Sequence, residues 1–594
     1  MPMPNFSGKT ATAMSELHRR LLRDLPDRRM SKAGDFNTEA RAVRAWVDAL
    51  PLANFSATAR MLVEALRAMN RMRTAPAERL EALEILRVPV NQLAGLVEKQ
   101  IIGASFPLPP QRTELGTLAQ KFQNELARGY RIALYDFCAP NGSAPMLRRK
   151  QVTTAAVRAL IHGGARLHRA YLLYRTPPPG AWQELHDVYR FIASLGLDHR
   201  AVDDAVVGAP ITAMTAYTHA LLLALANPYH FTQRELVEVI ALTAAFAPYC
   251  EFGAGTGETL AAYAVDADND SGPGYLPEER ESGNHGLMSI SLAKVLDHVE
   301  SQIASLPPGL RLVTFRMRGG PPIQVDIDLT QRLVDGWSSA GERGDIRLPG
   351  GYELQSVIGL HDLHFMLSGN LDFEAFLRRI RGTTIHLSGS DTAASWVHGN
   401  AENLRAQAMP ARIIDQGFGG YRLLWERRGS GEAVKAKVGE LVGLALPDGG
   451  GLPPDWMVGV IRWMRVDDEA RIDAGIALLA RRSLAVGISA LDASGNPLSD
   501  RRGILLAPIR ADDTAVYSSL LAPGLFERDA GSIRLTLPED PHRWPSSACS
   551  FDVSGAGLME SAGAYLRFTL PALDLPDEGL SAANPQRVAE DEPA

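Results

Sequence analysis

The residues of this chain that could do chemistry gather in two glycine-rich segments rather than in a catalytic motif. One segment is Asp415–Gly420 (Asp-Gln-Gly-Phe-Gly-Gly), and the other is Glu251–Gly257 (Glu-Phe-Gly-Ala-Gly-Thr-Gly). An acidic side chain beside several glycines suits a ligand-binding turn, because glycine lets the backbone turn tightly and approach a ligand closely. The sequence has no Gly-x-Ser-x-Gly elbow, no Walker-type phosphate loop and no His-Glu-x-x-His motif. The neighbouring His361 and His364 have no cysteine or carboxylate at ligand spacing, so we predict no metal site.

The elements around Asp415 read as short strands. Apolar runs at Ala411–Ile414 and Tyr421–Trp425 flank the turn and predict a β-hairpin. Further runs follow at Lys437–Leu446, Met457–Val466 and Ala474–Leu479, and Pro and Gly separate the first two. Several short strands with regular turn signals predict a small antiparallel barrel.

This order of motifs resembles the PilZ domain, a family of six-stranded barrels best known for binding cyclic di-GMP. The family's turn motif is Asp/Asn-x-Ser-x-x-Gly; Asp415 and Gly420 match it, and Gly417 replaces the Ser. The family's later strands are matched by Gly-Val-Ile-Arg-Trp at Gly459–Trp463 and by Gly-Ile-Ala-Leu-Leu at Gly475–Leu479. The resemblance implies a non-catalytic, cytoplasmic bacterial signalling protein that responds to cyclic di-GMP and acts through protein partners of its helical domain.

In the family, an Arg-x-x-x-Arg motif before the turn binds the nucleotide, and arginine suits this role because its planar guanidinium binds phosphate through two hydrogen bonds. No Arg-x-x-x-Arg lies at the family's usual distance from Asp415. The residues that the resemblance then implies for ligand binding are Arg378, Arg379, Arg381, Arg405, Arg412, Asp415, Gly417, Gly420 and Arg462. The departures from the motif leave an alternative open, in which the barrel binds no nucleotide and the chain is a protein-binding adaptor.

Two other motifs have simpler interpretations. Glu251–Gly257 resembles the first motif of S-adenosylmethionine-dependent methyltransferases, which requires a buried strand before it and a helix after it. The preceding segment Glu235–Ala247 favours a helix, so this enzyme is kept only as a second alternative. Asp552–Gly557 (Asp-Val-Ser-Gly-Ala-Gly) fits the PilZ turn motif in every fixed position, but no strand like Gly459–Trp463 follows it, and we interpret it as a glycine-rich hairpin turn.

Composition narrows the class of protein. The formal net charge of −7 over 594 residues argues against a general nucleic-acid or anionic-membrane binder, and it leaves room for a local basic patch. The three cysteines are far apart and lack metal-ligand spacing, which predicts reduced thiols, no structural disulfide and no structural zinc site; we expect no cofactor, with cyclic di-GMP as the possible ligand. No apolar run is long enough for a membrane span, so we expect a cytoplasmic protein.

The predicted fold class is a multidomain α+β protein. We expect an N-terminal α-helical domain, an intermediate mixed α/β segment, a C-terminal antiparallel PilZ-like barrel and a further β-rich extension. The predicted boundaries are a disordered N-terminus at 1–35, the helical domain at 36–262, the mixed segment at 263–400, the barrel at 401–490, the extension at 491–573 and a disordered tail at 574–594. Whether the two β-rich parts form one barrel or two is left open.

Overall fold

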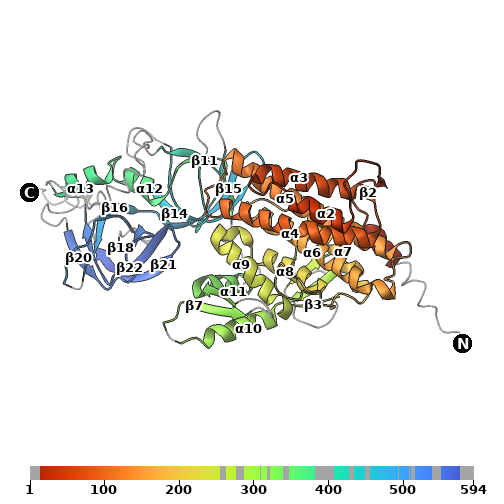
Figure 1. Cartoon of the computed structure of the whole chain (residues 1–594). Coiled ribbons are helices and arrows are strands. Elements are labelled where there is room, and N and C mark those ends of the chain that lie inside the picture. The colour runs from red at the N-terminus through yellow and green to blue at the C-terminus, as the bar shows by residue number, and fades with distance from the viewer. Residues whose placement is uncertain are drawn as a thin grey trace, which may run out of the picture. The chain divides into compact units, whose positions relative to one another are not determined.

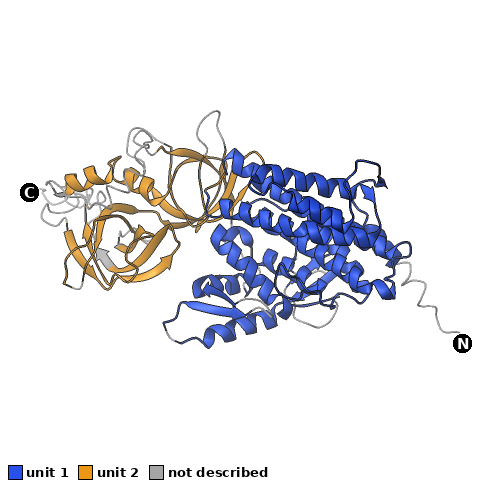
Figure 2. Cartoon of the chain, in the orientation of Figure 1, with its two compact units in different colours: residues 1–104, 108–343 blue, residues 105–107, 344–594 orange. Residues whose placement is uncertain are grey.

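The computed structural model describes residues 14–254, 263–275, 286–307, 309–316, 322–338, 347–381, 407–426, 434–447, 455–492, 494–507, 509, 516–537 and 550–574. The chain divides into two compact units (Figure 2). Unit 1 comprises residues 1–104 and 108–343, and unit 2 comprises residues 105–107 and 344–594. The three residues 105–107 therefore belong to unit 2 although the sequence on both sides of them belongs to unit 1.

Unit 1 is built around long helices (Figure 1). Apolar side chains recur at helical spacing and are buried, as with Leu62, Leu66 and Met69 in one helix. Thr212 and Thr232 form capping boxes at the N-termini of the helices that begin at Ala213 and Gln233. The helices are α2 (Ala40–Asp48), α3 (Phe55–Asn70), α4 (Pro76–Ile101), α5 (Pro110–Cys138), α6 (Arg149–Leu172), α7 (Ala181–Ser194), α8 (Ala213–Leu225) and α9 (Gln233–Phe246). None of the helices in the described ranges is long and apolar enough to cross a membrane.

The described part of the N-terminus is ordered, which differs from the expectation for residues 1–35. His18 and Leu21 are almost fully buried. His18 stacks on Tyr135 with ring centroids 4.2 Å apart, and its Nε2 lies 2.9 Å from the Tyr135 carbonyl oxygen. Short strands β1 (Arg29–Met30) and β2 (Met72–Arg73) pair in parallel. A few well-placed apolar and aromatic side chains thus fix a segment whose average composition is polar.

The remainder of unit 1 mixes strands and helices. Strands β3 (Glu251–Ala254), β6 (Leu287–Ser291), β4 (Tyr263–Asp266) and β5 (Gly274–Tyr275) form an antiparallel sheet in that order. A hairpin of β7 (Leu312–Arg316) and β8 (Pro322–Asp326) follows, with helices α10 (Ala293–Ala304) and α11 (Ile327–Ser338). Leu287–Ser291 form β6 rather than an earlier start of α10, because they pair with both β3 and β4.

Unit 2 contains a closed antiparallel barrel. Its strands pair in the order β10, β13, β14, β15, β12, β11, and β11 pairs back with β10. The strands are β10 (Glu353–Ile358), β11 (Met409–Gly417), β12 (Gly420–Trp425), β13 (Leu441–Ala445), β14 (Met457–Val466) and β15 (Ile472–Ala480), and the short β9 (Leu348–Pro349) adds to the edge of β11. This first barrel begins before residue 401, because β10 is separated from β11 by helices α12 (Leu360–Leu367) and α13 (Phe373–Arg381).

The β-rich extension has the same strand order as the first barrel. Its sheet runs β20, β19, β16, β17, β18, β22, β21. Strands β20 and β21 are joined by only two residues, Gly555 and Ala556, so they act as two halves of one interrupted fifth strand that brings the ends of the sheet together. The members are β16 (Ser483–Ala490), β17 (Arg501–Leu506), β18 (Val516–Pro523), β19 (Ser532–Thr536), β20 (Ser550–Ser554), β21 (Gly557–Ser561) and β22 (Tyr565–Asp574). We call this sheet the second barrel, and the β-rich parts are therefore two barrels rather than one.

The two barrels share a hydrophobic core within unit 2. Val458 and Trp456 of the first barrel pack in one cluster with Ile504, Leu521 and Tyr565 of the second. Helix α13, inserted between β10 and β11, buries one face against β16 of the second barrel (Figure 1). The first barrel thus covers part of the second with its own insertion.

Candidate functional site

The predicted hairpin forms and places Asp415 near its end. Gly417 pairs with Gly420, leaving Phe418 and Gly419 as the turn, and the Phe418 side chain is exposed. Gly420 is required by packing, because a Cβ there would lie 1.9 Å from the carbonyl oxygen of Ile476 on β15. The glycine that ends the motif therefore lets β12 pack directly against β15.

Asp415 is held by an arginine that the sequence analysis did not select. Nη1 of Arg347 donates to Oδ1 of Asp415 at 2.6 Å. The short strand β9 causes this approach, because its Pro349 pairs with Asp415 in antiparallel register. A second guanidinium lies nearby, with Nη1 of Arg422 at 3.9 Å from Oδ2 of Asp415.

Arg422 is held by further groups on neighbouring strands. It donates two hydrogen bonds to Asp473 on β15, at 2.9 and 2.8 Å, and its Cζ lies 5.9 Å from the ring centroid of Trp463. The hydrogen bond to Asp473 is the main cause that raises the pKa of Arg422, and the charges of Asp473 and Asp415 add to it. Gly475 makes room for the ring, because a Cβ there would lie 1.9 Å from Nε1 of Trp463. Arg347 just before β9, Asp415 on β11, Arg422 on β12 and Asp473 on β15 thus alternate in charge across this part of the sheet.

Arg347 ends an Arg-x-x-x-Arg sequence, Arg343-Gly-Asp-Ile-Arg347, that comes just before β9. This motif is further from the turn than the family spacing predicts, because α12, α13 and residues 382–408 separate β10 from β11 along the chain. The sequence feature that could have revealed this site is the Arg-x-x-x-Arg motif itself, which directly precedes Leu348 and Pro349. Arg343 lies outside the described residues, and Arg347 is the member whose contact is seen.

The other predicted arginines have different partners. Arg412 pairs with Glu426 at 3.0 Å, and Arg462 pairs with Glu560 of the second barrel at 2.8 Å. Arg378 pairs with Glu374 along α13, and both Arg378 and Arg379 are exposed on a helix that packs on the second barrel. The hairpin therefore brings Asp415, Gly417 and Gly420 together, while Arg378, Arg412 and Arg462 pair with acidic residues other than Asp415. Arg405 and the side chain of Arg381 lie outside the described part of the chain.

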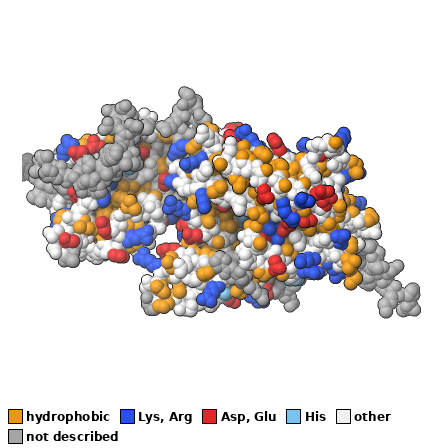
Figure 3. Space-filling view, viewed as in Figure 1, with side chains coloured by type: hydrophobic (Ala, Val, Ile, Leu, Met, Phe, Trp, Pro, Cys, Tyr) orange, Lys and Arg blue, Asp and Glu red, His pale blue; other side chains and the backbone are white. Residues whose placement is uncertain are grey.

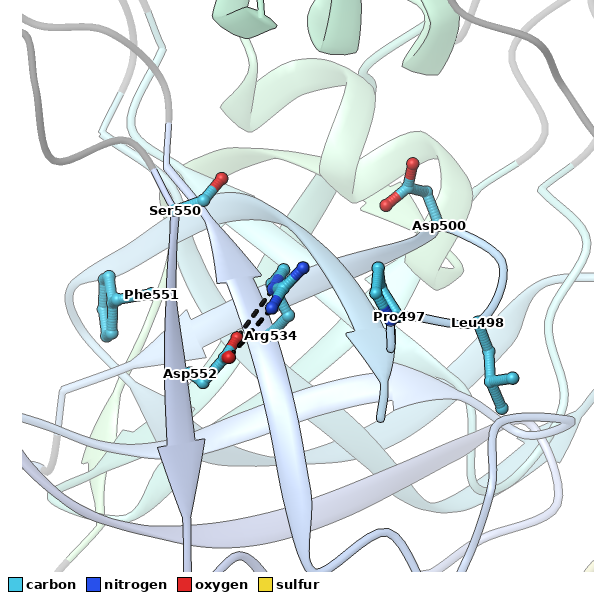
Figure 4. A pocket seen from close by; sticks show the side chains of 7 residues that line it. All are labelled: Pro497, Leu498, Asp500, Arg534, Ser550, Phe551 and Asp552. Carbon is cyan, nitrogen blue, oxygen red and sulfur yellow. Dashed lines mark hydrogen bonds and ion pairs between the residues drawn. The ribbon is translucent and has the colours of Figure 1, made fainter. Parts of the chain in front are cut away.

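The second Asp-x-Ser-x-x-Gly sequence does not form the hairpin turn that was predicted. It links β20 to β21 within the interrupted fifth strand, and the two segments do not pair with each other. Gly555 has a φ of 81°, which bends the strand at that point. Arg534 donates two hydrogen bonds to Asp552 and lowers the pKa of its carboxyl group, in a shallow pocket of about 350 Å³ (Figure 4). Asp552, the acidic residue of this second motif, is thus paired with Arg534 on the outside of the second barrel.

The methyltransferase alternative lacks its structural context. Helix α9 precedes the motif, as the sequence predicts, and β3 is an antiparallel strand at the edge of its sheet. The cofactor turn of that enzyme class follows a strand of a parallel sheet. The glycines Gly255 and Gly257 lie outside the described residues, and nothing in the fold or the comparisons supports this alternative. No group of His, Cys, Asp and Glu that could hold a metal ion occurs within the described ranges.

The architecture and the Asp415 hairpin define a multidomain α+β protein with a six-stranded antiparallel barrel that presents charged groups beside a glycine turn. Comparison with family models agrees: "Cyclic-di-GMP receptor FimW, N-terminal domain" matches residues 41–256, and "Cyclic-di-GMP receptor FimW, middle PilZ domain" matches residues 262–407 and 389–484. The residues that form the first barrel thus match a PilZ domain, as their motifs suggested. The chain is 24% identical over 551 residues to the cyclic-di-GMP receptor FimW of Pseudomonas aeruginosa, covering 84% of this chain and 86% of that protein. A comparison with solved structures found no match.

Proposed function

We propose that this chain is a non-catalytic receptor for cyclic di-GMP whose site lies at Arg347 and Asp415 of the first barrel. The observation that carries the proposal is the contact between these two side chains, since it joins the Arg-x-x-x-Arg sequence to the turn motif across a long insertion. The family resemblance and the name of the Pseudomonas relative support the same ligand.

The charges at this site suit a dianionic dinucleotide. A guanidinium has five N–H donors, and one of those on Arg347 is used by Asp415. Among the described residues the remaining donors have no other partner, and the side chain is more than half exposed, so they can bind a phosphate while Asp415 fixes the orientation of the group. Arg422 adds a second oriented cation on the next strand. The missing serine hydroxyl at Gly417 is thus offset by charged groups that the sequence motif does not include.

The chain also offers a route by which such a site would act on the helical unit. Phe106, between α4 and α5, forms an antiparallel bridge to Ala436 with both hydrogen bonds at 2.9 Å, and Lys435 Nζ donates to the carbonyl oxygen of Pro107 at 2.5 Å. A few residues after Ala436, the N–H of Gly439 donates to the carbonyl oxygen of Ile461 on β14, and the N–H of Ile461 donates to the carbonyl oxygen of Glu440. Ile461 lies two residues before Trp463. A ligand that alters the Arg422–Trp463 contact would therefore act on strands that hold the α4–α5 connection, and the output would be a change in what the helical unit binds.

Titration calorimetry of the full chain tests the proposal, with GTP and S-adenosylmethionine as comparison ligands. We expect cyclic di-GMP alone to bind with micromolar or tighter affinity, about 8 kcal/mol. Arg347→Ala and Asp415→Ala should each weaken binding roughly 10- to 100-fold, because hydrogen bonds to charged groups contribute about 1.5–3 kcal/mol. Arg534→Ala is the matched control, since it breaks the equivalent kind of ion pair in the second barrel and should leave the affinity unchanged. Absence of binding by the folded chain would refute the proposal and favour the protein-binding adaptor.

A further inference from the structure

A second feature of the surface lies in the helical unit, on the connection between α5 and α6. A single 3₁₀ turn, η1 (Met146–Arg148), carries two neighbouring apolar side chains of which Met146 is 83% and Leu147 97% exposed. Three consecutive cations follow at once, Arg148, Arg149 and Lys150, and all three are exposed. We call these five residues the 146–150 patch.

Folding does not explain the composition of the 146–150 patch. Exposure of a methionine and a leucine contributes no core packing. Arg149 and Lys150 lie in the first turn of α6, where the helix macrodipole favours anions, and that turn contains no acidic residue. Within the described part of the chain none of the three cations has an acidic partner; Arg148 donates only to the amide oxygen of Gln151, at 3.4 Å. By contrast, acidic and basic side chains are interspersed on the face of unit 1 shown in Figure 3.

The connection that carries the patch is held in a defined conformation. Gly142 has a φ of 72°, its N–H donates to the carbonyl oxygen of Cys138 at 2.8 Å, and a Cβ on it would lie 2.9 Å from Cβ of His18. The N–H of Arg148 donates to the carbonyl oxygen of Pro145 at 2.8 Å. The apolar pair and the cations are therefore presented together rather than scattered by a loose loop.

We propose that the 146–150 patch binds the surface of an anionic lipid bilayer. Two flexible aliphatic side chains beside three cations match the boundary between acyl chains and negatively charged headgroups. A bilayer needs no complementary shape, whereas a stable protein interface buries about 800 Å² on each side and relies on aromatic anchors. The patch is a single protruding turn without an aromatic ring, so its shape favours the bilayer over an acidic protein. This inference does not depend on the proposed nucleotide site.

Co-sedimentation of the full chain with vesicles tests the inference, using phosphatidylcholine alone and phosphatidylcholine mixed with phosphatidylglycerol. Binding should require the anionic lipid and should weaken as salt screens the charges. Neutralising all three cations (R148Q/R149Q/K150Q) should weaken binding by up to about 100-fold, at about 1 kcal/mol for each cation near the surface. The variant M146S/L147S should also weaken binding, because it removes the apolar contact.

Leu525→Ser provides a matched control, because Leu525 is fully exposed but has no run of cations beside it. It should bind vesicles like the original chain. Unchanged circular dichroism of the 146–150 variants, whose side chains are all exposed, would show that any loss is not due to unfolding. Equal binding to neutral and anionic vesicles, no binding to either, or full binding by the triple variant would each overturn the inference; capture of an acidic protein without vesicle binding would also count against the bilayer.

Discussion

The two barrels of unit 2 have the same strand order and use it differently. In the first barrel the connection between the second and third strands is the Asp415 hairpin, and β9 brings Arg347 to it. In the second barrel the corresponding connection, residues 507–515, contains no glycine and no Asp-x-Ser-x-x-Gly pattern. The pattern that fits every fixed position of the motif lies instead in the interrupted fifth strand. The position of a motif in the strand order, rather than its letters, decides whether it can form a ligand site.

The final glycine of each motif shows the same contrast in packing. Gly420 faces a backbone carbonyl, which cannot move aside without displacing β15. Gly557 faces only the hydroxyl of Thr569, at 3.1 Å from a Cβ position, and a side chain can change rotamer. The first barrel therefore requires glycine at position 420, whereas the second barrel can accommodate a small side chain at position 557.

The largest expected effect on stability in this comparison follows from these two glycines. Gly420→Ala should destabilise unit 2 by about 1–3 kcal/mol, because it overpacks a backbone contact. Gly557→Ala should change stability by less than about 1 kcal/mol, since any crowding is partly offset by the lower entropy of the unfolded chain. Urea unfolding followed by hydrogen exchange measures both, with β12 reporting on the first barrel and β22 on the second. Equal shifts of the urea midpoints of Gly420→Ala and Gly557→Ala would show that the two barrels do not differ in how tightly these glycines are packed.

Much of the first barrel could be predicted from the sequence, because the information is local. The hairpin around Asp415 and the strands at Met457–Val466 and Ile472–Ala480 follow from apolar runs and turn residues. The start of the barrel could not be placed in this way. Segment 357–366 combines the end of β10 with most of α12. Because a strand is followed at once by a helix, its apolar residues follow neither the two-residue spacing of a strand nor the 3.6-residue spacing of a helix.

The candidate site was only partly predictable, for a different reason. Asp415, Gly417 and Gly420 follow from a contiguous motif, but Arg347 contacts Asp415 from 68 positions away in the chain. Helices α12 and α13 are inserted between β10 and β11. This insertion lengthens the sequence separation between Arg347 and Asp415 without changing the strand order of the barrel. The same limit explains Arg462, which matches a family strand by sequence but points to a partner in the second barrel.

An intermediate effect is expected from His364, which joins the inserted helices of the first barrel to the second. Its side chain is fully buried, with Nε2 3.2 Å from the carbonyl oxygen of Val486 and its ring packed on Phe373 and Phe376. Burial is the main cause that lowers the pKa of His364 to about 3. Because the unfolded chain binds a proton near pH 6.5 and the folded chain does not, the stabilising contribution is complete above pH 6.5 and is lost as the pH falls toward 3.

Between pH 7 and pH 5 this one group should lower the free energy of unfolding by about 2 kcal/mol. Hydrogen exchange of β16, which α13 covers, measures the effect locally, and exchange in β11 and β12 serves as the internal reference. His364→Gln keeps a hydrogen-bond donor without a titrating group, so it should remove the acid sensitivity of β16. Persistence of that sensitivity in the variant would assign it to other residues.

The smallest expected effect concerns Arg462, whose ion pair with Glu560 crosses from the first barrel to the second. Both side chains are partly exposed, so Arg462→Gln should cost less than about 1 kcal/mol of stability. Glu560→Gln should cost a similar amount, and the double variant should show little further loss because the two residues act on each other. Since Arg462 is engaged with the second barrel, neither variant should change the affinity for cyclic di-GMP. A loss of affinity in Arg462→Gln comparable to that in Arg347→Ala would instead mean that Arg462 leaves Glu560 to bind the nucleotide, and that the second barrel competes with the ligand for this arginine.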